Sequence, residues 1–291
     1  MVELIWRLLN YLCVGILYLK DDGALSRNLQ MDDFKTNIVG HWGTCPAINA
    51  IYVHLMDYCI RHKELSKSVK MIIGTGHSAP SLLAAGFLDG TLSKYYPDYR
   101  REVAGISDLF NAYGATFSSE IDARYPGNIF CGGELGAGLA FSQGYVFNHP
   151  ERIVVCVIGD GEFETPVCQA SFHGFQLIDK RTDGRVLPVI NLNGFKMGGE
   201  STLSGKTDED ISGYFRFFGL EAIFSDDCHD NISFSFEQCF EALAEGRFPI
   251  LVLKTIKGWT APKYMGNAPF DVTRQIEGGR NGGLFSQILP A

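Results

Sequence analysis

A doubly wound, mainly parallel α/β sheet with helices on both faces is predicted by the spacing of four apolar runs. The runs lie at 71–73, 153–158, 186–190 and 250–253, and β-branched residues are frequent in them. Short runs of this composition are typical of strands that are buried on both faces of a sheet. The first two are followed by Gly-rich turns and then by helical patterns, which is the alternation expected of βαβ units.

The length and composition of the chain fit one large domain. The chain has 291 residues, of which 46% are hydrophobic and 20% are charged, and its net charge is −8. We expect a single domain over 1–291, with an N-terminal helical extension at 1–35 and a C-terminal tail at 264–291. No Lys/Arg-rich run is present, so we expect no nucleic acid and no anionic membrane as a partner.

The cysteines and the N-terminal apolar stretch indicate where in the cell the protein is expected. Eight cysteines occur without a C-x-x-C pair or zinc-ligand spacing, which favours reduced thiols in a cytoplasmic protein. The apolar stretch 2–19 is interrupted by Glu3, Arg7 and Asn10 and would barely cross a bilayer. We interpret it as an amphipathic packing helix and not as a signal or an anchor.

Further helices are expected along the chain. One should follow Gly40–Pro46 and run over about 47–62, with Pro46 in its first turn. Others are expected after the turn 74–80, from the small-residue segment that starts at Gly132, and over 233–243. The segment 110–130 is punctuated by Gly and Pro and is expected to be irregular, and 214–224 carries a mixed apolar face.

Polar side chains follow two neighbouring strands at the points where they end. The run 153–158 ends in Gly159-Asp160-Gly161 with Glu162 next, and the run 186–190 is followed by Asn193. The carboxyl ends of parallel strands face the ligand crevice of an open sheet. A carboxylate, an amide oxygen and backbone carbonyls such as that of Phe195 are hard oxygen ligands, suited to Mg²⁺ or Ca²⁺. The glycines allow backbone N–H groups to approach a diphosphate, so a metal-bridged diphosphate is the natural ligand.

Gly-Asp-Gly followed some thirty residues later by Asn resembles the motif of thiamine diphosphate (ThDP) enzymes. Further segments are similar to phosphoketolases: 6–21, Gly40-His41-Trp42-Gly43-Thr44, 74–80, 132–140 and 257–263. The similarity runs from about Trp6 to Ile276. It implies the ThDP-binding fold, ThDP with Mg²⁺ as cofactors, and cleavage of a ketose or ketose phosphate with transfer of a two-carbon unit.

The resemblance also implies roles for individual residues. His41, His77 and Lys257 would be the catalytic side chains that face the substrate or the reaction centre. Asp160, Asn193 and Phe195 would bind the metal. The cofactor would contact a larger set of residues, which consists of Gly76, His77, Gly133, Glu134, Leu135, Gly136, Gly159, Asp160, Gly161, Glu162, Asn193 and Lys257.

Three positions depart from the phosphoketolase pattern. Glu120 and Arg274 stand where that family has histidines, and Cys131 stands where it usually has Glu. Dehydration of the two-carbon adduct needs groups that move protons near neutrality, as histidine does. The departures therefore indicate either ketol transfer or transfer of the two-carbon unit to an acceptor other than phosphate. A true phosphoketolase that forms acetyl phosphate remains the alternative.

Phosphoketolases continue through a pyrimidine-binding domain, which supplies the Glu that activates ThDP, and no segment here resembles that domain. We therefore expect a separate pyrimidine-domain subunit, with two copies of each chain in the assembly. A non-catalytic homologue that binds a partner is a further alternative. A nucleotide-binding α/β protein is disfavoured because neither a Walker A sequence nor G-x-G-x-x-G after a first strand occurs.

Overall fold

The fold is that of a computed structural model that describes residues 1–20, 23, 25–196, 199–260, 264–265 and 268–269. The α-helices are α1 (Val2–Tyr18), α2 (Cys45–Arg61), α3 (Ala79–Asp89), α4 (Thr91–Tyr95), α5 (Val103–Ala112), α6 (Ala137–Val146), α7 (Asp160–Phe163), α8 (Pro166–Ser171), α9 (Asp208–Phe217) and α10 (His229–Ala244). Short 3-10 helices lie at Met31–Asp33, Lys63–Leu65, Gly76–Ser78 and Phe172–Leu177. None of these described helices is long and apolar enough to cross a membrane.

Five parallel strands form the main sheet. They are β1 (Val69–Ile73), β2 (Ile153–Gly159), β3 (Arg185–Leu192), β6 (Glu221–Ser225) and β7 (Pro249–Lys254), in the spatial order β1-β2-β3-β7-β6. Two-residue strands make two hairpins, β4 (Phe195–Lys196) with β5 (Gly199–Glu200) and β8 (Tyr264–Met265) with β9 (Ala268–Pro269). The predicted α/β fold is confirmed, and all four predicted runs lie in strands of the sheet.

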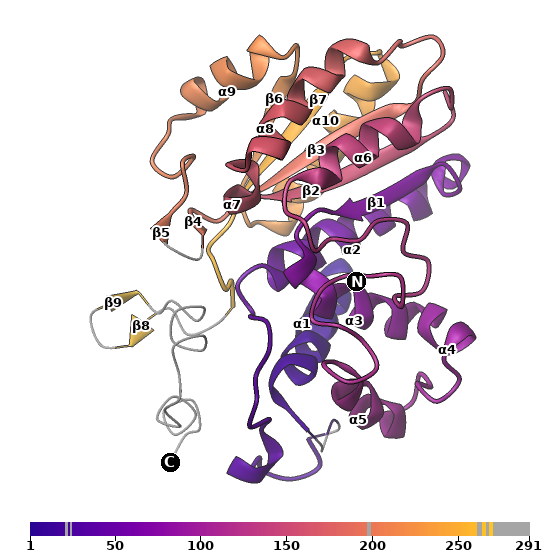
Figure 1. The fold of residues 1–291 in the computed structure, drawn as a ribbon, viewed down its shortest axis with the longest axis vertical. Coiled ribbons are helices and arrows are strands. Elements are labelled where there is room, and N and C mark those ends of the chain that lie inside the picture. The colour runs from indigo at the N-terminus through magenta and orange to yellow at the C-terminus, as the bar shows by residue number, and fades with distance from the viewer. Residues whose placement is uncertain (21–22, 24, 197–198, 261–263, 266–267, 270–291) are drawn as a thin grey trace.

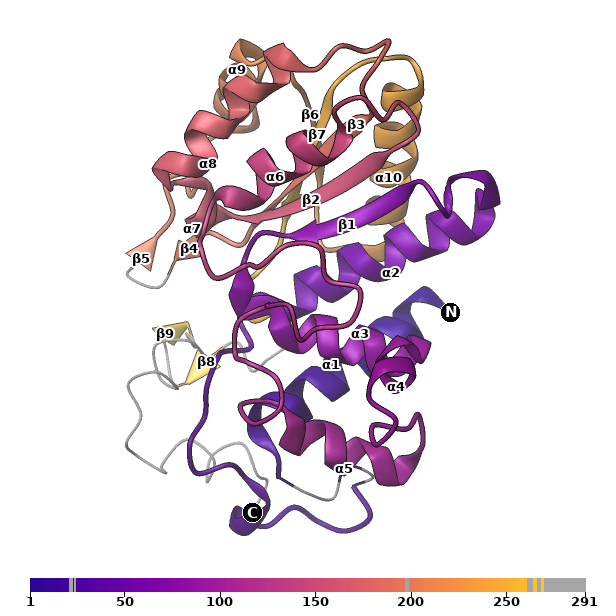
Figure 2. The ribbon, with the colours of Figure 1, turned by 45° about the vertical axis from the view of Figure 1, so that its right-hand side comes forward.

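Alternate residues of the strands face two separate cores. Val155 and Val157 of β2 belong to the larger core, which α1, α2, α3, α5 and α10 cover. Val154, Cys156 and Ile158 belong to the core beneath α6, α8 and α9. Figures 1 and 2 show α6 and α8 on one face of the sheet and α2 and α10 on the other. This double burial explains why the strands read as nearly continuous apolar runs.

Helix α1 is a packing helix, as expected. Its Leu9, Leu12, Cys13, Ile16 and Leu17 are fully buried in the larger core. Gly15 permits the close packing against α5, because a Cβ there would lie 1.9 Å from the Phe110 ring. The N-terminal segment is thus part of the interior of the domain.

The small-residue segment differs from the expectation that a helix starts at Gly132. Residues 132–136 form turns, and α6 begins only at Ala137. The reason is Gly136, whose φ of +94° is left-handed and incompatible with a helix interior. Within α6, Gly138 allows close backbone approach, since a Cβ there would lie 2.9 Å from the Gly74 Cα atom at the end of β1.

Candidate functional site

Asp160 lies at the carboxyl end of β2 and is almost completely buried, with 2% of its surface exposed. Its Oδ2 atom accepts hydrogen bonds from the Gly194 N–H at 2.7 Å and from the Ser201 hydroxyl at 3.0 Å. Its Oδ1 atom accepts one from the Gly161 N–H at 3.0 Å. The carboxylate therefore connects the end of β2 to the segment that follows β3.

Burial raises the pKa of Asp160 to about 6, although the three hydrogen bonds and the charge of Lys257 act in the opposite direction. Among the described residues no side chain forms an ion pair with this carboxylate. A buried carboxylate without a cationic partner is costly, and a bound cation would compensate its charge. Lys257 itself donates to the Lys196 carbonyl oxygen at 3.4 Å, beside the same segment.

The segment after β3 folds back as the hairpin β4–β5 next to Asp160. Asn193 is buried, and its Oδ1 atom accepts a hydrogen bond from the Phe195 N–H at 3.1 Å. Glu164 holds the hairpin from the β2 side, because its carboxylate pairs with the Lys196 ammonium group and accepts from the Thr202 N–H. The three metal ligands proposed from the sequence thus lie at the end of β2 (Asp160), in the turn after β3 (Asn193) and at the start of the hairpin (Phe195).

This donor set fits Mg²⁺ or Ca²⁺ better than a transition metal. The described residues contain no group of three or more His, Cys, Asp or Glu side chains that could hold a metal ion. A cation here would take the Asp160 carboxylate, an amide oxygen, a backbone carbonyl and oxygens from a ligand or water. That is the coordination hard cations accept.

Glu162 is predicted from the sequence as a cofactor-binding residue, and its carboxylate has three protein partners. Its Oε1 atom accepts from the Gly136 N–H at 3.0 Å, and its Oε2 atom accepts from the Thr75 hydroxyl at 3.0 Å and the Gly159 N–H at 3.2 Å. Burial raises the pKa of this carboxyl group. Glu162 thereby ties together the end of β1, the end of β2 and the start of α6.

The other predicted diphosphate-side residues lie in the turn before α6. Gly133, Glu134 and Leu135 are exposed, whereas Gly136 is buried and its N–H is already donated to Glu162. Gly161 follows Asp160 in α7, and a Cβ there would lie 2.9 Å from the Lys196 Cβ atom. Because the Gly136 N–H donates to Glu162 and the Gly161 N–H donates to Asp160, an anion would take its donors from the exposed turn at 133–135.

The three predicted catalytic residues come from segments that meet. The rings of His41 and His77 lie 5.7 Å apart between centroids. The Gly258 N–H donates to the Gly43 carbonyl at 2.9 Å, which brings the Lys257 turn against the His41 turn. The His77 Nδ1 atom also pairs with the carboxylate of Glu120.

Sequence reasoning missed several side chains that shape this edge. Ser201, Thr75 and Glu164 are polar residues in turns, and nothing in their spacing distinguishes them from solvated loop residues. Arg274, one of the three departures, lies outside the described residues, and so does most of the predicted tail at 264–291.

Comparison with known proteins identifies the family. The sequence matches the family described as XFP N-terminal domain over residues 1–279. A probable phosphoketolase of Rhodopseudomonas palustris is 36% identical, over 92% of this chain and 36% of that protein. One from Chlorobaculum tepidum is 35% identical, over 91% of this chain and 36% of that protein. The chain therefore spans little more than a third of the length of these relatives.

Solved structures with the same fold include transketolases. The enzyme from Leishmania mexicana superposes with a TM-score of 0.63 at 16% identity, covering 90% of this chain and 38% of that one. The Campylobacter jejuni transketolase gives 0.58 at 16% identity, covering 87% and 37%. These likenesses concern the fold alone, while the sequence match covers nearly the whole chain. The chain belongs to the phosphoketolase family as its N-terminal (XFP_N) domain.

Proposed function

We propose that this chain is the diphosphate-binding part of a ThDP-dependent enzyme that cleaves a ketose or ketose phosphate and transfers a two-carbon unit. One observation carries the proposal beyond family membership. Asp160, a buried carboxylate with no ion-pair partner among the described residues, lies at the strand end next to the Asn193 hairpin. Such a carboxylate suits a metal-bound diphosphate.

In this proposal Asp160, the Asn193 amide oxygen and the Phe195 carbonyl oxygen hold Mg²⁺ or Ca²⁺. Backbone N–H groups in the exposed turn at 133–135 would bind the diphosphate oxygens. Glu162 contributes by fixing Gly136 and Gly159 in place, because its carboxylate accepts hydrogen bonds from both backbone N–H groups and from the Thr75 hydroxyl. ThDP, when bound, supplies the carbanion chemistry that breaks the carbon–carbon bond.

His41, His77 and Lys257 act on the substrate in this proposal. The centroids of the two imidazole rings lie 5.7 Å apart, and both rings can bind hydroxyl groups and move protons. The Lys257 ammonium group suits a substrate phosphate or a developing oxyanion. With Glu120 and Arg274 where phosphoketolases have histidines, we favour ketol transfer or an acceptor other than phosphate over acetyl phosphate formation.

We further propose that a separate pyrimidine-domain subunit completes the site, with two copies of each chain. The reason for this proposal is that ThDP enzymes of this kind need a Glu from a pyrimidine-binding domain, and no segment of these 291 residues resembles one. A cytoplasmic location fits the eight free cysteines. The competing proposals are a phosphoketolase that makes acetyl phosphate and a non-catalytic homologue that binds a partner.

The test is purification of the chain with its bound proteins from native cells, followed by calorimetry with ThDP and Mg²⁺. Wild type should bind ThDP only with Mg²⁺ present, and Asp160→Asn should lose binding by about two orders of magnitude, as expected when a charged ligand is removed. Asp179→Asn, at a surface carboxylate paired with Arg181, is the matched control and should bind normally. Absence of metal-dependent ThDP binding in the assembly would refute the proposal. Tight binding by the isolated chain would refute the need for a partner.

A further inference from the structure

The Glu120 carboxylate faces His77. Glu120 is one of the positions where the sequence has no histidine although phosphoketolases have one, so the sequence indicated the loss of a catalytic side chain there. The Oε1 atom pairs with His77 Nδ1, and about a third of each side chain is exposed. A pair this exposed contributes little to stability. Its consequence is therefore the orientation and protonation of the imidazole.

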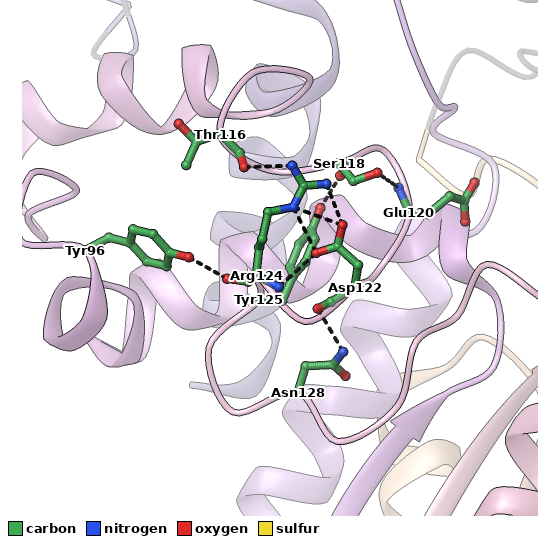
Figure 3. A network of polar contacts seen from close by, with 8 residues as sticks. All are labelled: Tyr96, Thr116, Ser118, Glu120, Asp122, Arg124, Tyr125 and Asn128. Atoms are coloured by element: carbon green, nitrogen blue, oxygen red, sulfur yellow. Dashed lines mark hydrogen bonds and ion pairs between the residues drawn. The ribbon is translucent and has the colours of Figure 1, made fainter.

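The loop that carries Glu120 is held by its own polar network. Figure 3 shows Asp122 paired with Arg124 and the Tyr125 hydroxyl donating to the Ser118 carbonyl oxygen. The Glu120 N–H donates to Ser118 Oγ at 3.3 Å. In the same view the Glu120 carboxylate points away from this network. The network fixes the backbone on both sides of Glu120 and leaves its carboxylate for His77.

Backbone contacts bring this loop against the turn that carries His77. The Ile121 N–H donates to the Gly76 carbonyl oxygen at 3.3 Å, and the Gly132 N–H donates to the Ile121 carbonyl oxygen at 3.0 Å. Gly76 makes the approach possible, because a Cβ there would lie 2.0 Å from Glu120 Oε2 and 2.3 Å from the Gly132 oxygen. A side chain at position 76 would therefore collide with the Glu120 carboxylate and with the Gly132 backbone.

We propose that Glu120 is a positioning residue whose carboxylate accepts a hydrogen bond from the Nδ1–H group of His77, so that Nε2 becomes the nitrogen that exchanges a proton with the substrate. The inference rests on the proposed function, in which His77 lies beside the reaction centre. As a base, Nε2 takes the proton of a substrate hydroxyl; the O–H bond breaks, the N–H bond forms, and the electron pair stays on oxygen. The carboxylate balances the imidazolium charge, which a histidine at position 120 would not do. Among the described residues, the ionisable groups that face the His77 ring include Glu120 from the loop and His41 from the turn before α2.

The experiment is NMR of the chain labelled with ¹⁵N-histidine, followed over a pH series without cofactor. Neutral His77 should carry its proton on Nδ1, and its titration midpoint should fall in Glu120→Gln. Glu120→Asp keeps the charge and should restore part of the shift. Glu151→Gln is the matched control, because it removes the carboxylate of a surface His149–Glu151 pair at 3.2 Å and should leave His77 unchanged.

If the wild-type spectra show neutral His77 with its proton on Nε2, the inference is overturned. This result needs no variant. Identical His77 titrations in wild type and a Glu120→Gln variant that unfolds at the same temperature would also overturn the inference. The calorimetric test with ThDP is separate. An Nδ1 proton without ThDP binding would refute the proposed function and keep the pairing, whereas ThDP binding with an Nε2 proton would refute the pairing alone.

Discussion

Asp160→Asn should change how the stability of the metal-free chain depends on pH. The Asp160 carboxyl group is buried, and its pKa rises from the ordinary 3.8 to about 6 in the folded chain. Between these two values the folded state binds more protons than the unfolded state. Stability therefore falls as pH rises through this window. The amide in the variant does not titrate and lacks this dependence.

The magnitude follows from the two pKa values. A difference of about two pH units corresponds to about 3 kcal/mol when the window is crossed completely. Over the experimentally accessible range of about pH 4.5 to 7.5, roughly 2 kcal/mol of this remains, because the unfolded carboxyl group is already largely ionised at the lower limit. The amide loses at least one of the hydrogen bonds from Gly194, Ser201 and Gly161, which costs about 1 kcal/mol at every pH.

The assay is urea unfolding of both proteins with a chelator present, at several pH values. The unfolding free energy of Asp160→Asn minus that of wild type should increase by about 2 kcal/mol from low to neutral pH. Asp98→Asn, at an exposed carboxylate, controls for the general effect of an acid-to-amide change. A difference that stays constant with pH would refute the argument that burial without a cation destabilises the charged form.

Three further outcomes are expected. Glu162→Ala should lower the unfolding free energy by about 3–5 kcal/mol in urea titrations, because three buried donors lose a charged acceptor. A loss below about 1 kcal/mol would contradict the idea that Glu162 holds the three segments together. In α6, Gly138→Ala should destabilise because its Cβ would meet backbone at 2.9 Å, while Gly144→Ala in the same helix has open space and should stabilise by about 0.5–1 kcal/mol; equal effects in thermal melts would refute the packing argument. The His54 Nε2 atom and the His229 Nδ1 atom share a hydrogen bond of 2.9 Å, and burial lowers the pKa of His54 to about 4. Stability should therefore be lost as pH falls from about 6.5 towards 4, and His54→Gln should show a flatter pH profile in the same assay.

The sheet could be predicted because its strands are buried on both faces. β2 and β3 read as uninterrupted apolar runs, and the structure extends both by only one or two residues at their ends. The strand β6 was missed, since its residues Glu221–Ser225 are at most partly buried over most of its length and carry a weak pattern at the sheet edge. Burial on both faces is what makes a parallel strand visible in sequence.

The site could be predicted in part for a similar reason. Residues that follow parallel strands must meet at one edge, so Asp160 and Asn193 were expected to lie together. The partners of a side chain that arrive from distant loops follow no such rule. Glu120 and His77 are 43 positions apart in the sequence, and the helices α3, α4 and α5 lie between them. Because Glu120 belongs to the irregular segment after α5, their pairing had no signal in the sequence.

The two buried carboxylates after β2 illustrate how the same edge serves folding and binding. Glu162 accepts from donors on three different segments, so its charge is compensated by the assembled fold and its removal should be felt as lost stability. Asp160 is also hydrogen-bonded, but two of its donors come from the segment after β3, which Glu164 holds from outside. Its charge therefore depends on a short hairpin and a ligand for full compensation. If this division is right, Glu162→Gln should impair folding more than ligand affinity, and Asp160→Asn should do the reverse.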